Sequence, residues 1–208
     1  MVKVLAPALS LEASGSLGGA LVFSTWKGRP YVRTLVKPTN PKSEMQVGIR
    51  AMMKYLGQHW ASIKTADEHY WEDLAENANI STFNAYIKEN MSQWRNGLAP
   101  SSLYPAPRVQ SPTAIASLGT NPGPRNVALT YMLTAEEEQQ GIVLCRSLVT
   151  GFTPSWANAI LVQFCDDELA HTFVDAPLDP ATYFYRCAAF TLDGSLGTFI
   201  TEVEETVV

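Results

Sequence analysis

The side chains that most often carry chemistry are scattered along this chain of 208 residues. Its three histidines, His59, His69 and His171, show no H-x₃-H spacing and no C-x₂-C partner, so the sequence predicts no metal site. The acidic runs at 136–138 and 166–168 lack the alternating ligands and central glycine of a calcium loop and are typical of solvated turns. Phosphate-binding and nucleophile-elbow motifs are absent from the sequence. We therefore expect a protein that is not an enzyme and that uses no cofactor.

A second group of side chains is suited to binding a partner. Residues 1–54 hold 8 basic and 2 acidic side chains, with aromatic residues among them. The candidate interaction residues are Lys27, Arg29, Tyr31, Arg33, Lys42 and Arg50. Basic side chains among aromatic ones can bind single-stranded nucleic acid, whereas arginines also pair with carboxylates of a neighbouring protein.

The distribution of charge favours the protein partner. Residues 1–100 carry 11 basic and 8 acidic side chains, a net charge of +3, while residues 101–208 carry 4 and 12, a net charge of −8. The sequence pI of about 5.2 lies far below the ~9 typical of nucleic-acid-binding domains. A basic head and an acidic body predict a homo-oligomer or ring assembled through complementary faces, with nucleic acid as the alternative. No apolar stretch approaches ~18 residues, so we expect no membrane partner.

The basic residues must be held by a β-hairpin. Residues 20–26 and 29–36 have strand composition and flank Lys27-Gly28, where a glycine in the second turn position is typical of a hairpin. The preceding stretch, 14–19, is rich in glycine and serine and is expected to be a turn. Pro30 cannot donate to a neighbouring strand, so we expect the second strand of the hairpin to begin at a sheet edge.

Three helices are expected after the hairpin. Apolar residues recur every three or four positions over 43–64 and 80–98, which marks one face of a helix in each segment. Thr65-x-x-Glu68 is typical of a capping box that opens another helix between them. Apolar stripes need partners, so we expect the hairpin and a three-helix bundle to form one domain over residues 1–96.

Residues 97–125 have the composition of a linker. Thirteen of these 29 positions are Gly, Pro or Ser. Proline-rich segments are semi-rigid and extended, so we expect this linker to hold two bodies apart.

Residues 126–208 are expected to form an all-β domain. Six candidate strands separated by turn-rich stretches indicate a seven-strand sandwich, so the fold class is α+β in two parts. The stretch Leu178-x-Pro180-Ala181-Thr182-Tyr183-Phe184-Tyr185-Arg186-Cys187, followed by Asp193-Gly194-Ser195, resembles the penultimate strand and final turn of fibronectin type III and immunoglobulin-like domains. The resemblance implies that Tyr185, two residues before Cys187, is the tyrosine corner of such a sandwich.

The same resemblance bears on the cysteines. Cys145 and Cys187 are expected on the second and sixth strands, where immunoglobulin domains place a disulfide. Three cysteines are too few for a disulfide scaffold, so we favour two buried thiols over a bridge.

The first 90 residues are similar to uncharacterised proteins of tailed phages and prophages. The residues that carry this resemblance are Lys27-Gly28-x-x-Tyr31-Val32-Arg33, Pro38-x-Asn40-Pro41-Lys42-Ser43-x-x-Gln46-x-x-x-Arg50, Thr65-x-x-Glu68-x-x-Trp71-x-x-Leu74-Ala75 and Phe83-Asn84-Ala85-Tyr86. It implies a structural virion protein, made in the host cytoplasm, that is associated with the neck, tail or baseplate and contacts other virion proteins. The alternatives are a capsid decoration protein, a nucleic-acid-binding accessory protein and a secreted adhesion module.

Overall fold

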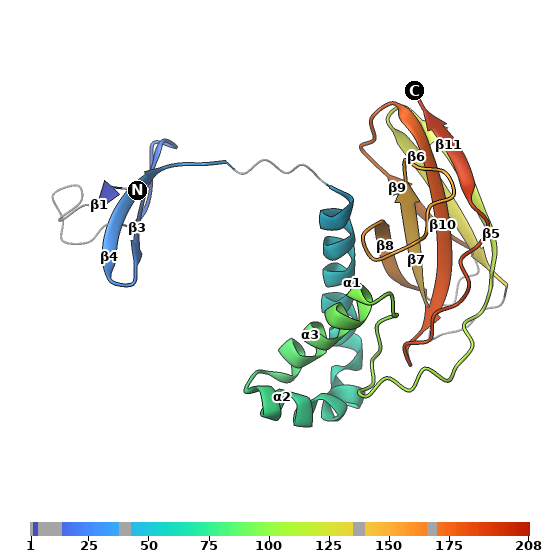
Figure 1. Cartoon of the computed structure of the whole chain (residues 1–208), viewed down its shortest axis with the longest axis horizontal. Coiled ribbons are helices and arrows are strands. Elements are labelled where there is room, and N and C mark those ends of the chain that lie inside the picture. The colour runs from blue at the N-terminus through green and yellow to red at the C-terminus, as the bar shows by residue number, and fades with distance from the viewer. Residues whose placement is uncertain (1, 4–13, 38–42, 135–139, 166–169) are drawn as a thin grey trace. The chain divides into compact units, whose positions relative to one another are not determined.

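The computed structural model describes residues 2–3, 14–37, 43–134, 140–165 and 170–208 (Figure 1). The chain divides into two compact units, unit 1 over Met1–Pro41 and unit 2 over Lys42–Val208. This boundary differs from the expected one near residue 96, because the helices belong to the same unit as the sandwich.

Unit 1 is a small antiparallel sheet. Its strands are β1 (Val2–Lys3), β2 (Gly15–Leu17), β3 (Leu21–Trp26) and β4 (Arg29–Thr34), in the order β1-β4-β3-β2. The expected hairpin is present: β3 and β4 pair from Leu21↔Thr34 to Trp26↔Arg29, and Lys27 and Gly28 both have positive φ, as in a type I′ turn. The glycine-rich stretch before it, expected to be only a turn, also contributes β2.

Four helical segments open unit 2. They are α1 (Glu44–Asp67), the 3₁₀ helix η2 (Glu68–Trp71), α2 (Glu72–Ala78) and α3 (Thr82–Arg95). The expected capping box is wrong, because α1 continues through Thr65 and the Glu68 carboxylate instead accepts a hydrogen bond from the Thr82 hydroxyl at 2.6 Å. Ser81 caps α3, since its hydroxyl oxygen accepts from the Asn84 N–H at 3.2 Å.

Seven strands form the expected sandwich of two antiparallel sheets, and the fold is α+β. One sheet has the order β11-β10-β7-β8 and the other the order β5-β6-β9. The strands are β5 (Ile115–Gly123), β6 (Asn126–Leu133), β7 (Gln140–Ser147), β8 (Ala159–Cys165), β9 (Ala170–Asp175), β10 (Ala181–Thr191) and β11 (Val203–Val207). Leu129, Tyr131, Ile142 and Leu144 are among the fully buried residues between the two sheets. This is an immunoglobulin-like arrangement.

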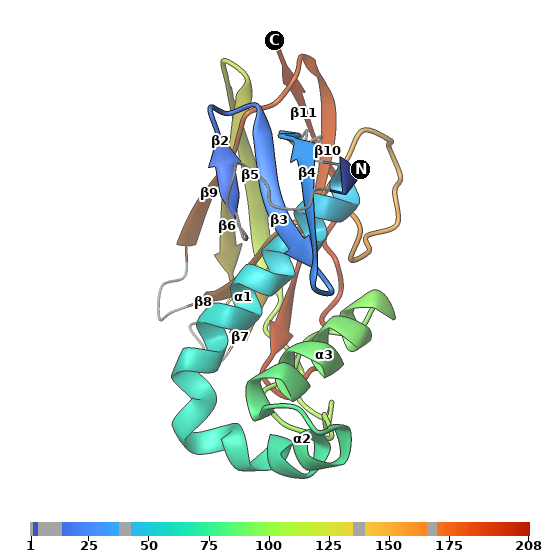
Figure 2. The ribbon, with the colours of Figure 1, turned by 90° about the vertical axis from the view of Figure 1, so that its left-hand side faces the viewer.

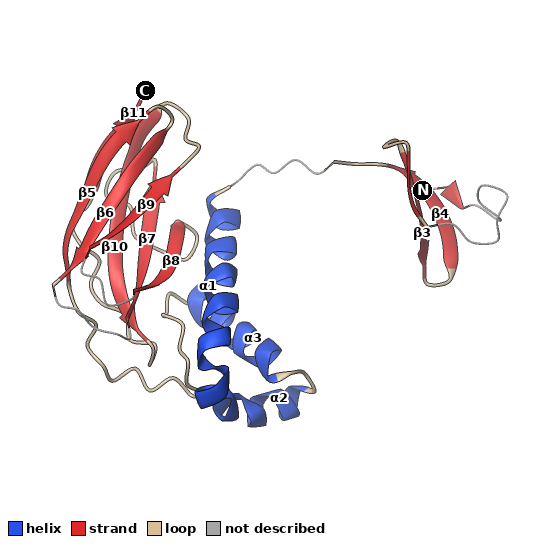
Figure 3. Ribbon diagram, turned by 180° about the vertical axis from the view of Figure 1, so that it is seen from behind, coloured by secondary structure: helices blue, strands red, loops and turns tan. Residues whose placement is uncertain are grey.

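The helices cover the outer face of the four-stranded sheet, with α1 lying along β8 (Figures 2 and 3). The core between them contains Met52, Tyr55, Leu56, Trp60, Trp71 and Tyr86 from the helices and Val143, Val162, Ala188 and Phe190 from the sheet. The approach is close at Gly48, where an added Cβ would lie 2.2 Å from the Trp156 carbonyl oxygen. The apolar stripes of the helices therefore find their partner in the four-stranded sheet of the same unit.

The segment 97–125 does not hold two bodies apart. Its last part is β5, a strand of the sandwich, and its first part is fixed to the helices and to the β10–β11 connection. The Ser101 N–H donates to the side-chain oxygen of Asn90 at 2.7 Å, and the Asn90 side-chain nitrogen donates back to the Ser101 carbonyl at 3.1 Å. The Ser102 N–H donates to the Leu192 carbonyl at 2.8 Å. The indole N–H of Trp71 donates to the Ser102 carbonyl at 2.8 Å. The segment joins the helices to the sandwich as one compact unit.

Candidate interaction surfaces

The sheet of unit 1 presents two chemically different faces. In the antiparallel register Trp26 lies opposite Arg29, Ser24 opposite Tyr31 and Val22 opposite Arg33. Directly opposed side chains point to the same side of a sheet, so these residues share one face. The Trp26 side chain is 63 % exposed, and the Lys27 ammonium lies 4.9 Å from its ring centroid. We call Trp26, Arg29, Tyr31 and Arg33 the basic face.

The other face of the same sheet is apolar. The register places Phe23 opposite Val32, Thr25 opposite Pro30 and Leu21 opposite Leu17. Leu17 is 60 % exposed and Leu21 is 37 % exposed. None of the described side chains of unit 1 is buried. The basic side chains and the apolar side chains of this small sheet are thus both available to a partner.

The structure separates the six expected interaction residues. Arg29, Tyr31 and Arg33 lie together on the basic face, with Lys27 in the adjoining turn. Arg50 is exposed on α1 and belongs to unit 2. Lys42 lies outside the described residues. The sequence does contain a signal for the basic face. Arg29, Tyr31 and Arg33 occupy every second position of one predicted strand, and side chains at such positions point to the same side of a sheet.

The tyrosine corner of the sandwich is formed by Tyr183 and not by Tyr185. The Tyr183 hydroxyl donates to the backbone carbonyl of Asp179, four residues earlier, at 2.9 Å. The Tyr185 hydroxyl instead donates to the Asp175 carboxylate at 3.2 Å. Arg146 forms a salt bridge to that carboxylate at 2.7 Å, which joins β7 of one sheet to β9 of the other. Burial, and then the negative charge of Asp175, raise the pKa of Tyr185.

Cys145 and Cys187 are buried free thiols, as favoured from the sequence; Cys187 lies on the sixth strand as expected, but Cys145 does not lie on the second. Cys145 lies on β7, the third strand of the sandwich, and pairs with Arg186, while Cys187 on β10 pairs with Leu144. Adjacent pairs along two strands point to opposite faces. Cys145 accordingly packs in the core under the helices and Cys187 in the core between the sheets. Burial raises the pKa of both thiols to about 12, so they are uncharged at neutral pH.

An acidic turn anchors the middle of the 97–125 segment. The Asp193 carboxylate accepts from the N–H groups of Val109 and Gln110 at 2.7 and 2.9 Å and from that of Ser195 at 2.9 Å. Burial of Asp193 opposes ionisation, but these hydrogen bonds and one from the Thr191 hydroxyl together hold its pKa well below the ordinary value. The sequence identified Asp193-Gly194 as a turn but carried no signal for its partners.

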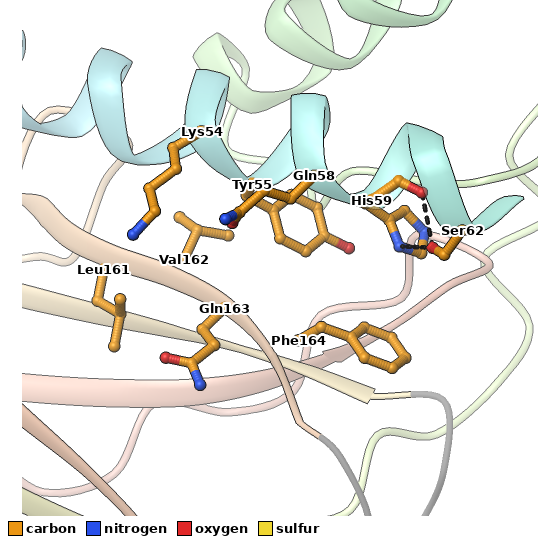
Figure 4. Close-up of a pocket in the computed structure, with 9 residues that line it drawn as sticks. All are labelled: Lys54, Tyr55, Gln58, His59, Ser62, Leu161, Val162, Gln163 and Phe164. Carbon is orange, nitrogen blue, oxygen red and sulfur yellow. Dashed lines mark hydrogen bonds between the residues drawn. The ribbon is translucent and has the colours of Figure 1, made fainter. Parts of the chain in front are cut away.

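A pocket of about 430 Å³ lies between α1 and β8 (Figure 4). His59 forms part of its wall, with its ring stacked between Tyr55 at 5.3 Å and Phe164 at 5.5 Å between centroids. The Ser62 hydroxyl donates to the His59 carbonyl at 2.7 Å, so its oxygen is left to accept from Nδ1–H at 3.3 Å. This assigns the proton to Nδ1 and leaves Nε2 as an acceptor, buried and without a hydrogen-bond partner in the described part of the chain. Burial lowers the pKa of His59 to about 4.

The described residues contain no cluster of three or more potential metal ligands. Among the helices that the structure describes, none combines the length and the apolar character needed to cross a membrane.

Comparison with known proteins found similarity to solved structures only. No family model and no curated protein matches the chain. One similar structure is a family 76 glycoside hydrolase from a bovine Bacteroides thetaiotaomicron strain, with 9 % identity, a TM-score of 0.36, and coverage of 46 % of this chain and 20 % of the hydrolase. Another is the PKD domain of an M14-like peptidase from Thermoplasmatales archaeon SCGC AB-540-F20, with 15 % identity, a TM-score of 0.30, and coverage of 47 % of this chain and 98 % of that domain. The chain thus spans only a fifth of the hydrolase.

Proposed function

We propose that this protein is a non-enzymatic structural component of a tailed-phage virion, associated with the neck, tail or baseplate, and that unit 1 docks it onto a neighbouring subunit. The observation that carries the docking role is the absence of any buried side chain among the described residues of unit 1. A domain of about 40 residues seldom folds without disulfides, metals or a partner. A small sheet whose described side chains are all at least partly exposed therefore needs another surface to complete its core.

Charge indicates which kind of surface this is. Residues 1–41 carry 5 basic and 1 acidic side chains, whereas residues 42–208 carry 10 and 19. A basic docking unit is steered towards an acidic surface and away from another basic one. The resemblance of the first 90 residues to phage proteins supports a virion as the assembly that provides this surface. In this proposal unit 1 alone is the anchor, and the helices and sandwich together form the projecting body.

The test is the copy number of variants in purified particles, measured by quantitative mass spectrometry against the major capsid protein. The double variant Arg29→Glu/Arg33→Glu reverses the basic face, and we expect it to be lost from particles. The control is Lys64→Glu/Lys88→Glu, which makes the same change in net charge on exposed residues of α1 and α3. Equal incorporation of both variants would overturn the docking role of unit 1.

The copy number of the unmodified protein separates the positions on a particle. A low, ring-sized number fits the neck, tail or baseplate, and a number close to that of the capsid protein fits a capsid decoration. Complete absence from particles would overturn the virion proposal.

Nucleic acid is the second candidate partner, favoured by the exposed Trp26 beside Lys27, Arg29 and Tyr31. Aromatic rings that stack bases within a basic surface are typical of single-strand binding. A gel shift with single-stranded DNA that weakens steeply as salt rises, and that Arg29→Glu/Arg33→Glu removes, would support this alternative. No shift at low salt would exclude it.

A further inference from the structure

Strand β8 is an edge of the four-stranded sheet. Its hydrogen-bonding partner is β7, and residues 161–164 make no backbone hydrogen bond to any other segment of the described chain. An edge strand directs the N–H and C=O groups of every second residue away from its partner, and proteins often block such edges with charges or prolines. The sequence of β8, AILVQFC, contains neither. The backbone groups along this edge are therefore available to an added strand.

The pocket of about 430 Å³ between α1 and β8 follows the same edge. Four consecutive residues, Leu161 to Phe164, line it although their side chains alternate between the two faces of the sheet, so the pocket reaches the edge itself. The facing wall is a polar row on α1, made of Lys54, Gln58 and Ser62, which are spaced four residues apart and share one face of the helix. Lys54 lies at the Leu161 end of the pocket and Ser62 at the Phe164 end (Figure 4).

The two walls match each other in length. From Lys54 to Ser62 the helix rises by about 12 Å, at about 1.5 Å per residue. From Leu161 to Phe164 the strand extends by about 10 Å, at about 3.3 Å per residue. An extended segment of about four residues can therefore pair with β8 while its alternate side chains face the polar row of α1. Peptides that add to a sheet edge gain affinity from backbone hydrogen bonds and specificity from pockets for alternate side chains.

Charge indicates what the added segment carries. Among the described residues that line the pocket, Lys54 is the only lysine and none is an arginine or a carboxylate residue. A carboxylate on the segment would complement the Lys54 ammonium. A second β8 has no carboxylate to offer, and pairing of two β8 strands would bring both α1 helices together on one face of the joined sheet. The described strands of unit 1 contain no carboxylate either.

We propose that the edge of β8 binds an extended, acidic segment of another protein, which adds a strand to the four-stranded sheet and places a carboxylate against Lys54. This surface lies in unit 2 and does not include the basic face of unit 1. The proposal does not rest on the virion role.

Selection of random heptapeptides from a display library on the full chain tests the proposal. We expect the selected peptides to be enriched in Asp or Glu and to lack proline at their centre. Lys54→Glu should weaken the binding of the synthesised peptides by about tenfold or more in calorimetric titrations, and a new selection on this variant should favour Lys or Arg. The control Lys64→Glu makes the same change in charge on an exposed position of α1 outside the pocket and should leave binding unchanged. Circular dichroism melts confirm that both variants are folded.

Methylation of the peptide backbone separates strand addition from attraction between charges. In an added strand, one of the two alternate sets of peptide amides faces β8. Methylation of that set removes its hydrogen-bond donors and should abolish binding, whereas methylation of the other set should be tolerated. Hydrogen exchange should show that the unmethylated peptide protects amides of residues 161–164.

Four results would overturn the proposal. The first is a selection without enrichment of acidic peptides, and the second is equal binding of these peptides to Lys54→Glu or of both methylated forms to the unmodified protein. The third is loss of binding only in Arg29→Glu/Arg33→Glu, which would place the peptides on the basic face of unit 1. The fourth is protection of residues 161–164 that rises with protein concentration alone, which would identify a second copy as the occupant.

Discussion

In unit 2, side chains from the helices and from both sheets fill two cores, whereas in unit 1 none of the described side chains is buried. Unit 2 excludes water from residues as large as Trp71, Tyr86 and Phe190. Strands β2, β3 and β4 of unit 1, for which burial is described, show only half-buried and exposed positions. The hydrophobic effect can therefore stabilise unit 2 from within, whereas the described side chains of unit 1 bury too little surface for this, and the proposed docking role would supply the missing contacts. The four predictions below test this difference.

The same substitution in the two units should have very different effects. Phe190→Ala removes a ring that lies over Gly141 and meets Tyr55 edge-on at 5.5 Å, so we expect the free energy of unfolding to fall by about 3–5 kcal/mol. Phe23→Ala in unit 1 removes a half-buried ring and should lower the free energy of unfolding by less than about 0.5 kcal/mol. Urea unfolding of both variants measures the difference. Comparable losses would show that unit 1 has a core of its own.

The stability of unit 2 should depend on pH through His59. The pKa of His59 is about 4 in the folded protein and 6.5 for the exposed group, so between these values the unfolded chain binds a proton that the folded chain does not. The stability contributed by neutral His59 is therefore complete above pH 6.5 and is lost as the pH falls towards 4. The loss amounts to roughly 3 kcal/mol.

Unfolding of the unmodified protein and of His59→Leu across this pH range measures the contribution. Carboxylates titrate in both proteins, so the difference between them reports His59. Gln58→Leu, on the neighbouring exposed position of α1, should keep the pH dependence of the unmodified protein. An unchanged slope in His59→Leu would contradict the assignment.

Alanine substitutions at two glycines of α1, Gly48 and Gly57, separate the effect of packing against the sandwich from the effect of helix propensity. Gly48→Ala would force a Cβ against the Trp156 carbonyl, so we expect a loss of about 1–3 kcal/mol as the helix moves away from the sandwich. Gly57→Ala meets no atom within 4 Å and should raise stability by about 0.5–1 kcal/mol, because alanine restricts the unfolded chain. Thermal melts measure both. A stabilising Gly48→Ala would mean that α1 is not held against the sandwich.

The sequence predicted the elements of the fold better than their partners. The helices follow from local periodicity, but an apolar stripe does not reveal what covers it. The sequence therefore predicts packing of the helices with the hairpin, whereas α1 lies against β8. Strand β5 was assigned to a linker because its sequence contains Gly119, Pro122 and Gly123. An edge strand tolerates such residues, because one side of it needs no hydrogen bonds.

One missed strand also explains the error at the cysteines. The sequence does not predict β5 and so places Cys145 on the second strand of the sandwich, although it lies on the third. The third and sixth strands, β7 and β10, are neighbours in one sheet, so the inter-sheet position of an immunoglobulin disulfide does not arise. Three of the six predicted interaction residues, Arg29, Tyr31 and Arg33, lie together on the basic face, whereas Arg50 lies in the other unit.

The smallest expected effect belongs to the turn of unit 1. Lys27 has φ of 50°, a left-handed conformation that asparagine adopts more readily than lysine does. Lys27→Asn should therefore slow hydrogen exchange of the β3 and β4 amides, by an amount equivalent to a few tenths of a kcal/mol. Lys27→Val is the opposing control, because a β-branched residue is strained at positive φ and should speed exchange. If backbone geometry stabilises unit 1, both Lys27 variants should change its hydrogen exchange, even though Phe23→Ala hardly changes its stability. If neither turn variant changes exchange, the hairpin geometry contributes little to the stability of unit 1.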